Sequence, residues 1–398
     1  MIAVHVVGRG AITPLGGTWS ASCEALARGL AAFAPVTGFD VQGFPSTAAA
    51  AVPADFRETA DRRLALALCA TDEAIAGLDL GPPGRLGVFI GAESGRSTLA
   101  TLVRLTRLAG GKHFDHAAFG RDAPALADRI DAAAVSPAAV ASALAGRIGA
   151  RGPVRTYSLA CASGSVAIAE AARAIEQGVC DLALCGGVGA DIDPLMLVGF
   201  GRLRALSARG LSCPFDLRRD GFVVGEGAAM LVLSRQPGAL PVALVGHART
   251  LDAHHLTAPD PSGRGAEAAM RGALAAAGDP AIDYVQAHGT STPLNDAIEA
   301  AALRRVLGDD LTGAAVGAVK GAVGHWIAGA GAIGALCALE AVTSGTCLPT
   351  AGLERPDPDC ALPHVMGAAI ERPVRAALVN AFAFGGANCS LVFARSVA

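Results

Sequence analysis

The chain has 398 residues, of which 52% are hydrophobic and 17% are charged, and its 32 basic and 35 acidic side chains give a formal net charge of −3. The hydrophobic content excludes disorder for most of the chain. The near-neutral charge and the aromatic content of 4% provide neither a basic surface nor stacking platforms, so we expect no nucleic-acid partner.

Strands and helices are predicted to alternate along the first part of the chain. Strands that are apolar on both faces and alternate with helices indicate a sheet covered by helices on both sides. The order of the elements predicts an α/β fold. The strands are expected at 4–8, 86–90, 154–159, 181–185 and 228–233, and the helices at 19–30, 63–78, 138–148 and 162–177.

The second part of the chain repeats this order of elements. The change falls in a segment that contains Pro237 and Gly238, which are typical of a linker. We therefore divide the chain into two duplicated halves, residues 1–236 and 237–398. The strands of the second half are expected at 241–246, 282–287, 316–319, 376–379 and 391–393, and its helices at 267–277, 296–307 and 329–343.

Neither a membrane span nor export is predicted. The uncharged stretch 321–339 is long enough to cross a bilayer, but its dense glycines and His325 favour a tightly packed buried helix. The first residues lack the basic region of a signal peptide and are predicted to form a strand. The 10 cysteines are scattered without a CxxC pair, which indicates a reducing cytoplasm and no structural zinc site.

Three reactive side chains each lie between a predicted strand and a predicted helix. Cys161 lies at a helix N-terminus, where the helix dipole and free N–H groups favour the thiolate. His288 and His325 each follow a strand directly. Taken singly, a buried structural role is the default for each of the three. Because α/β folds bind ligands at the carboxyl ends of strands, we expect the three side chains to meet in one site.

A cysteine with two histidines suits acyl transfer through a thioester. The second imidazole supplies a second N–H donor for a carbonyl oxygen that becomes an enolate. Near the end of the chain, Phe384 precedes two glycines that free the backbone to direct an N–H at a substrate oxygen, although a plain glycine turn between strands would look the same.

Taken in order, these motifs resemble the β-ketoacyl-[acyl-carrier-protein] synthases of the decarboxylating elongation type, in the thiolase-like superfamily. The resemblance covers almost the whole chain, and it implies a five-layered αβαβα fold of two duplicated halves that forms a cytoplasmic dimer. The motifs that carry it are residues 8–16, 160–164, 214–223, 225–228, 252–257, 288–293, 320–325 and 384–386.

The resemblance implies a decarboxylative Claisen condensation in fatty acid or type II polyketide or polyene biosynthesis. Cys161 would accept an acyl group from acyl-carrier protein. His288 and His325 would hold the thioester carbonyl of a malonyl unit while carbon dioxide leaves. The resulting carbanion would attack the acyl group on Cys161 and lengthen it by two carbons.

Further roles follow from the same resemblance. The backbone N–H groups of Cys161 and Phe384 would form the oxyanion hole, and Phe384 would also gate access of the malonyl unit. Glu299 would fix Lys320, which orients the site.

Three residues would contact the substrate. The resemblance implies that Thr290 and Thr292 hydrogen-bond the phosphopantetheine arm of the carrier protein, and that Phe200 lines the acyl pocket. No cofactor is expected beyond this arm. Gly334 replaces an acidic residue that some members use near a structural ion, so no metal is expected either.

Several departures from the family pattern leave alternatives open. Ala381, Ala383 and Ala387 stand where the family usually has Ser, Gly and Thr, which keeps a specialised polyketide or polyene pathway open beside fatty acid synthesis. The partner is acyl-carrier protein, with a homodimer or a heterodimer with a chain-length-factor-like subunit paired near residues 154–159. The alternative function is that of a non-catalytic chain-length-factor-like subunit, although such subunits lack the cysteine present here as Cys161.

Two related enzyme classes fit less well. An initiation synthase would combine Cys, His and Asn, whereas here the second basic group is His325. A biosynthetic thiolase would need a second catalytic cysteine before the C-terminal glycine turn, and Cys389 follows that turn.

Overall fold

The N-terminal half of the protein forms a five-stranded mixed sheet. In the computed structural model, which describes residues 3–53, 61–95, 99–110, 113–130 and 135–396, these strands are β1 (Val4–Ile12), β4 (Leu86–Gly91), β5 (Val154–Tyr157), β6 (Leu182–Ala190) and β7 (Val224–Ser234). They lie in the order β5, β4, β6, β7, β1. The first three run parallel, and β7 is antiparallel to both β6 and β1.

The C-terminal half builds a second sheet with the same pattern. Its strands are β8 (Val242–Leu251), β9 (Tyr284–Gln286), β10 (Ala315–Gly317), β13 (Ala376–Phe382) and β14 (Ala387–Arg395). They lie in the order β10, β9, β13, β14, β8. Again the first three are parallel, and β14 is antiparallel to both of its neighbours. Each strand of this half therefore has a counterpart in the first half, as expected for a duplicated fold.

The two sheets join edge to edge through their first strands. Val4 and His5 of β1 pair with Leu244 and Ala243 of β8, which makes one continuous sheet. The predicted division of the chain between residues 236 and 237 stays a prediction. Four short strands complete the sheets, namely β2 (Ala34–Pro35), β3 (Ala48–Ala50), β11 (Thr346–Cys347) and β12 (Ile370–Glu371).

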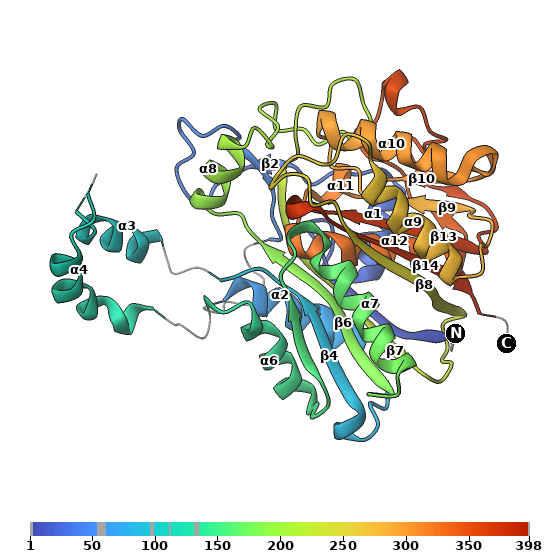
Figure 1. Cartoon of the computed structure of the whole chain (residues 1–398), viewed down its shortest axis with the longest axis horizontal. Coiled ribbons are helices and arrows are strands. Elements are labelled where there is room, and N and C mark those ends of the chain that lie inside the picture. Colours follow the sequence, from blue (N-terminus) through green and yellow to red (C-terminus); the bar gives the residue numbers. More distant parts are fainter. Residues whose placement is uncertain (1–2, 54–60, 96–98, 111–112, 131–134, 397–398) are drawn as a thin grey trace.

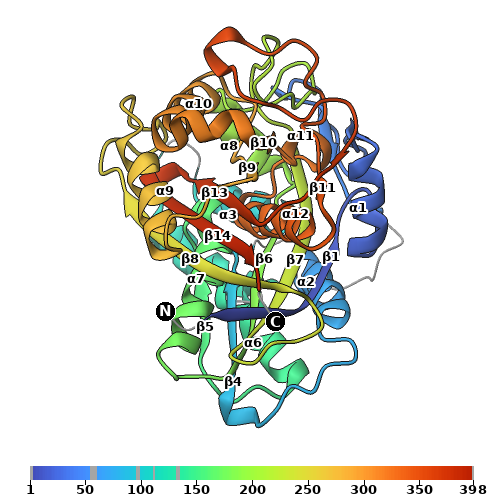
Figure 2. The same ribbon diagram turned by 90° about the vertical axis from the view of Figure 1, so that its right-hand side faces the viewer.

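Helices cover both sheets and fill the space between them, as Figures 1 and 2 show. One pair packs on the outer face of the N-terminal sheet, one pair lies between the sheets, and one pair packs on the C-terminal side. The resulting five layers confirm the predicted αβαβα arrangement. The pair on the outer face of the N-terminal sheet is α2 (Arg62–Ala74) with α6 (Ala138–Ile148). The pair between the sheets is α7 (Ser163–Glu176) with α12 (Ala330–Ser344). The pair on the C-terminal side is α9 (Arg264–Ala276) with α10 (Pro293–Leu307).

The central helix α12 is buried along nearly its whole length. Within the described residues, Ile327–Ser344 is the stretch long and apolar enough, by length and composition, to cross a membrane, and 83% of that stretch is buried inside the fold. A Cβ atom on Gly331 would lie 2.3 Å from Oγ of Ser165 on α7, so a side chain there would block the close contact of the two helices. The prediction of a tightly packed buried helix is confirmed.

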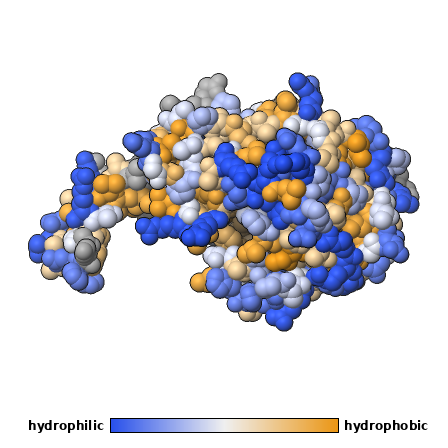
Figure 3. Space-filling model, turned by 90° about the horizontal axis from the view of Figure 1, so that it is seen from above, coloured by the Kyte–Doolittle hydropathy of each residue, from blue (hydrophilic) through white to orange (hydrophobic). Residues whose placement is uncertain are grey.

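Some elements were not predicted from the sequence. A helical arm stands clear of the body on the left of Figures 1 and 3 and carries both apolar and charged residues. The arm lies between β4 and α6, and its helices are α3 (Leu99–Leu108) and α4 (His116–Asp122).

Three further helices are α1 (Trp19–Ala27), α8 (Pro194–Arg202) and α11 (Lys320–Val323).

Candidate active site

The structure brings together the three reactive side chains that follow strands in the sequence. Cys161 lies in a short 3-10 turn between β5 and α7, and its Sγ is 3.0 Å from Nε2 of His325. His288 completes the group, and the sulfur and ring nitrogens of the three residues lie within 4.8 Å of one another. All three side chains are buried. The group is therefore a water-poor site at the carboxyl ends of strands, where α/β folds place ligands.

The backbone of His325 is held by the beginning of β7. Its N–H donates to the carbonyl of Val223 at 2.9 Å, and its own carbonyl accepts the N–H of Gly225 at 3.0 Å. A Cβ atom on Gly225 would be 2.2 Å from the carbonyl oxygen of Val323, so this close approach requires glycine. Nδ1 of His325 accepts the N–H of Ile327 at 3.1 Å, which leaves the hydrogen of the neutral ring on Nε2, facing Cys161.

Lys320 fixes the orientation of the other imidazole. Its ammonium group donates to the carbonyl of His288 and lies 3.3 Å from Nδ1 of the same residue. Because a lysine ammonium only donates, Nδ1 of His288 accepts and the ring hydrogen is on Nε2. Burial lowers the pKa of both His288 and His325 well below the usual value, and the charge of Lys320 lowers it further. The site thus presents two neutral rings, each with an Nε2–H donor.

The ionisation of Cys161 differs from the sequence-based expectation. Burial raises the pKa of the Cys161 thiol to about 12, although the Lys320 charge and the backbone N–H groups of Phe384 and of Cys161 itself lower it. The prediction that the helix N-terminus makes a resting thiolate is wrong, because desolvation outweighs the helix dipole here.

The two backbone N–H groups expected in an oxyanion hole, those of Phe384 and Cys161, both act on the sulfur. Each of them lowers the pKa of the Cys161 thiol. Gly385 and Gly386 have φ values of +84° and +79°, a left-handed turn that glycine adopts without strain. The N–H of Gly385 donates to the carbonyl of Leu256 at 2.7 Å and fixes this turn. Two donors therefore converge on the atom that would carry an acyl group.

Aromatic rings form one wall of the site. The ring centroid of Phe200, on α8, lies 5.3 Å from that of Phe222 and 6.5 Å from that of Phe384. Phe222 in turn lies 4.9 Å from the ring of His325. Phe222 was missed by the sequence analysis, although it lies within one of the motifs that carry the resemblance. These rings make an apolar surface beside the two nitrogen donors.

Glu299 acts differently from the expectation that it fixes Lys320. Among the residues that the structure describes, no ion pair joins the two side chains. Instead, the carboxylate of Glu299 accepts the backbone N–H groups of His288 at 2.7 Å and Gly289 at 2.8 Å. Burial raises the pKa of Glu299 to about 7 and lowers that of Lys320 to about 8. Both side chains therefore hold His288, one from its backbone N–H and the other from its carbonyl and ring.

A second buried carboxylate that sequence reasoning missed holds the same loop. Asp296 accepts the N–H groups of Thr290 at 3.0 Å, Ser291 at 3.1 Å and Phe215 at 2.8 Å. It lies three residues before Glu299 in the first turns of α10, so the two carboxylates share one helix face. That spacing directly after the turn residues 288–293 is the signal that could have found it.

The two threonines expected to contact the substrate arm lie on this loop. Their hydroxyl oxygens are 2.8 Å apart, with Thr290 buried and Thr292 half-buried at the N-cap of α10. Each hydroxyl retains hydrogen-bonding capacity beyond the bond they share. Their role in binding the arm stays a prediction.

The donor set of the site does not suit a metal ion. Cys161, His288 and His325 are close enough to share one, but Nδ1 of each ring is already occupied, so each Nε2 carries a hydrogen rather than a lone pair. The ammonium of Lys320 beside them would repel a cation. The expectation of no metal stays a prediction.

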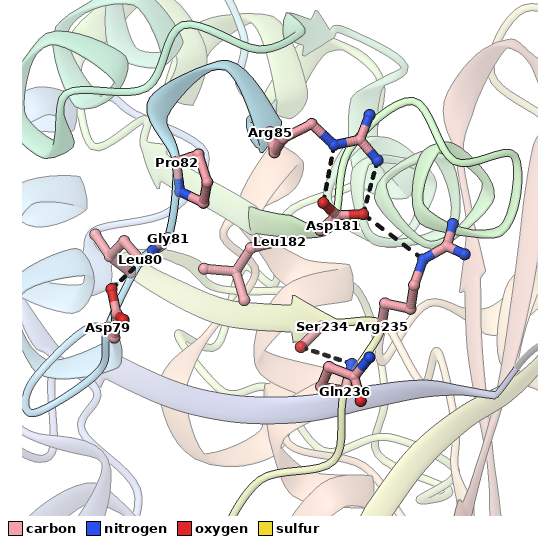
Figure 4. Close-up of a pocket in the computed structure, with 10 residues that line it drawn as sticks. All are labelled: Asp79, Leu80, Gly81, Pro82, Arg85, Asp181, Leu182, Ser234, Arg235 and Gln236. Carbon is pink, nitrogen blue, oxygen red and sulfur yellow. Dashed lines mark hydrogen bonds and ion pairs between the residues drawn. The ribbon is translucent and has the colours of Figure 1, made fainter.

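A separate cavity of about 350 Å³ lies at the opposite ends of the strands of the N-terminal sheet (Figure 4). Its Arg85 makes two bonds to Asp181, at 2.8 and 2.7 Å, and Arg235 lies 3.7 Å from the same carboxylate (Figure 4). Both arginines are therefore already paired, whereas the nucleophilic thiol and the two imidazoles lie in the separate site around Cys161.

Two family models match the chain over most of its length. Residues 1–239 match the model of the N-terminal domain of beta-ketoacyl synthase, and residues 242–354 match that of the C-terminal domain of beta-ketoacyl synthase. The two matches meet near the point at which the second sheet begins with β8.

Individual proteins are similar over the full length. The 3-oxoacyl-[acyl-carrier-protein] synthase 2 of Synechocystis sp. is 35% identical, covering 98% of this chain and 97% of that protein. A solved structure described as a type II polyketide acyl-carrier protein in complex with its ketosynthase, AntDE:AntF, matches with a TM-score of 0.86 at 27% identity over 99% of both chains. The ishigamide ketosynthase/chain length factor matches with a TM-score of 0.85 at 29% identity over 100% of this chain and 99% of that one.

Proposed function

The chain belongs to the β-ketoacyl synthase family, and from that membership we propose how its residues carry out the reaction. It is a 3-oxoacyl-[acyl-carrier-protein] synthase, an acyltransferase of fatty acid or polyketide biosynthesis with a thiolase-like fold. The observation that carries the residue assignment is the distance of 3.0 Å between Sγ of Cys161 and Nε2 of His325, with backbone N–H donors on the same sulfur.

In the first step, Cys161 takes the acyl group from its carrier. Sγ attacks the thioester carbonyl and forms the new carbon–sulfur bond, and collapse of the intermediate breaks the bond to the carrier sulfur, which leaves as a thiol with the proton that the Cys161 thiol gives up. The N–H groups of Cys161 and Phe384 stabilise the oxyanion of the tetrahedral intermediate. The Nε2–H of His325 and the charge of Lys320 stabilise the sulfur as it ionises.

In the second step, the malonyl thioester loses carbon dioxide. Its carbonyl oxygen accepts the Nε2–H groups of His288 and His325, so the electrons released by the carbon–carbon bond are held as an enolate. Neutral rings suit this task because they donate a hydrogen bond without transferring the proton. Lys320 acts as a positioning residue through Nδ1 of His288.

In the third step, the enolate carbon attacks the acyl carbonyl on Cys161. The oxyanion again forms at the N–H groups of Cys161 and Phe384. Its collapse breaks the carbon–sulfur bond, and Cys161 leaves as a thiolate that the surrounding donors stabilise before it takes up a proton. The product is a β-ketoacyl chain on the carrier that brought the malonyl unit, longer by two carbons.

The substrate brings its own prosthetic arm. We propose that Thr290 and Thr292 hydrogen-bond the phosphopantetheine, and that Phe200 and Phe384 line the path of the acyl chain. No cofactor of the protein takes part in these steps. The ten cysteines are all free, which supports a location in the reducing cytoplasm.

The enzyme test measures carbon dioxide and product together. Purified protein with acyl-carrier protein loaded with malonyl and with an acyl primer is expected to release carbon dioxide and to yield a carrier product two carbons longer, detected by intact mass. A series of primers of increasing length would identify the preferred acyl chain. Absence of both carbon dioxide and acylated Cys161 across the series would instead support the non-catalytic chain-length-factor-like subunit.

We propose that the protein pairs through β5, as a homodimer or with a chain-length-factor-like subunit. Within the described part of the chain β5 pairs with β4 alone, so its outer edge is open at the end of the sheet. Val154, the first residue of β5, and Leu159, two residues past its end, are each 41% exposed. An open, partly apolar strand edge is a template for pairing with a second chain.

A dimer is therefore expected in sedimentation equilibrium at micromolar concentration. Val154→Lys places a charge on the exposed edge and is expected to weaken association roughly tenfold or more while the monomer stays folded. A wild-type protein that sediments as a monomer, alone and with a chain-length-factor-like subunit, would contradict the proposal.

A further inference from the structure

The turn that carries the nucleophile has an unusual backbone conformation. Ala160, directly before Cys161, has a φ of +47°, a region that residues with a side chain rarely adopt. Such a conformation is strained and persists only where surrounding contacts enforce it. It determines how the N–H of Cys161, one of the two oxyanion donors, is aimed.

Glu93 supplies those contacts. It lies just past the carboxyl end of β4, and Oε1 of its carboxylate accepts the N–H of Ala160 at 3.0 Å. Its Oε2 accepts the hydroxyl of Ser158 at 2.8 Å. The carbonyl of Glu93 in turn accepts a hydrogen bond from the buried guanidinium of Arg63. One carboxylate therefore ties both sides of the strained turn to the end of a neighbouring strand.

The turn is closed from its other end by Ser163. The hydroxyl of Ser163 donates to the carbonyl of Ala160 at 2.7 Å and accepts the N–H of Leu159 at 2.8 Å. This hydroxyl also lies 3.4 Å from Oε1 of Glu93. The N–H of Ala160, however, has Glu93 as its partner, so the residue before the nucleophile depends on that carboxylate.

We propose that Glu93 is a positioning residue that holds the nucleophile turn in its strained conformation and places a negative charge beside the turn that carries Cys161. The first role fixes the aim of the Cys161 N–H. The second follows from charge, because a carboxylate near a thiol disfavours the thiolate. The resting thiol is thereby protected from alkylation and oxidation until a carrier-borne thioester arrives.

The other charged and titratable groups around Cys161 come from the second half of the chain. Lys320 on α11 favours the thiolate, and the neutral imidazoles of His288 and His325 face the sulfur from their loops. Glu93 is the negative charge that opposes Lys320 at this sulfur. Removal of the charge of Glu93, with its hydrogen bonds kept, is therefore expected to favour the thiolate of Cys161.

Glu93→Gln tests the charge. The amide oxygen can still accept the N–H of Ala160, and the hydroxyl of Ser158 can rotate to accept from the amide nitrogen. The pH midpoint of Cys161 alkylation by iodoacetamide, followed on the Cys161 peptide by mass spectrometry, is expected to fall by roughly 0.5–1 pH unit, and the rate at pH 8 to rise about three- to tenfold. An unchanged midpoint would overturn the charge role.

Glu93→Ala tests the positioning. It leaves the N–H of Ala160 without a partner, so the acyl transfer rate is expected to fall roughly tenfold or more at saturating substrate. Malonyl decarboxylation is expected to change less, because His288 and His325 are held by other loops. Equal loss of both activities, or no loss of acyl transfer, would overturn the positioning role.

Two control variants separate these effects from general damage. Ser158→Ala removes one hydrogen bond to Glu93 but keeps the charge, and Glu267→Gln removes a half-buried carboxylate on α9 that pairs with Arg271 and Arg305. Neither is expected to move the alkylation midpoint, and a shift as large as that of Glu93→Gln would refute a specific role. This inference rests on the proposed nucleophile, but the alkylation readout needs no condensation activity, so it is informative even if the proposed function fails.

Discussion

Cys161→Ala is expected to abolish acyl transfer and condensation while leaving malonyl decarboxylation in place. Removal of the nucleophile eliminates the covalent intermediate, so the condensation rate is expected to fall at least ~10⁴-fold. Decarboxylation requires the two Nε2–H donors of His288 and His325, and neither of them depends on the sulfur for its orientation. Because only a small side chain is removed, the buried turn is expected to keep its hydrogen bonds to Glu93.

The measurement pairs two readouts on the same protein. Intact mass after incubation with acyl-carrier protein reports the acylated enzyme, and labelled carbon dioxide from malonyl-carrier protein reports decarboxylation. Cys389→Ala is the matched control, since Cys389 is also a buried cysteine but lies outside the group formed by Cys161, His288 and His325. Retention of acyl transfer in Cys161→Ala, or its loss in Cys389→Ala, would refute the assignment of the nucleophile.

The fold could be predicted from the sequence because its signal is local and repeated. Apolar strands and Ala-rich helices alternate in both halves, and the paired sheets have the same order in each. The predicted strand ends were less accurate where a glycine was taken as the end of a strand. The strand predicted to end at residue 185 continues to Ala190, because Gly186 lets β7 approach so closely that a Cβ atom would lie 2.1 Å from the carbonyl of Ala229. That close approach depends on the neighbouring strand, so it cannot be recognised from the residues around Gly186.

The site could be predicted only in part for a similar reason. Cys161, His288 and His325 stand at strand ends in the sequence, and the fold brings such ends together. Glu93 and the contact of Asp296 with Phe215 could not be assigned in this way, because each involves a backbone segment that only the folded chain brings within reach. Their roles are set by tertiary contacts.

The ionisation of Cys161 shows the limit of local electrostatics. Its place before α7 correctly indicates stabilising N–H groups, yet the sequence does not reveal how completely the thiol is removed from water. The desolvation of a buried thiol raises its pKa by more than the helix N-terminus, Lys320 and two backbone donors lower it. The resulting neutral thiol is consistent with a nucleophile that is activated by its bound substrate.

Two residues that donate to the same enolate need not be equivalent, and His325→Ala is expected to reveal the difference. Loss of its Nε2–H removes one of the two donors, so the decarboxylation rate is expected to fall about 10²–10³-fold. Its Nε2 is also 3.0 Å from Sγ of Cys161, so acyl transfer is expected to slow as well. His288→Ala is expected to reduce decarboxylation similarly but to leave acyl transfer nearer to wild type, because His288 hydrogen-bonds Lys320 and Glu299 rather than the sulfur.

The replacement His325→Asn distinguishes the loss of a donor from the loss of packing. An asparagine amide provides an N–H without a titratable ring, so it is expected to recover roughly tenfold or more of the decarboxylation lost in His325→Ala. The thermal midpoints of both variants would verify that the contacts of the ring with Phe222 are not needed for folding. Full decarboxylation by His325→Ala would be incompatible with two imidazoles sharing the enolate, and the reaction would then depend on His288 and Lys320 alone.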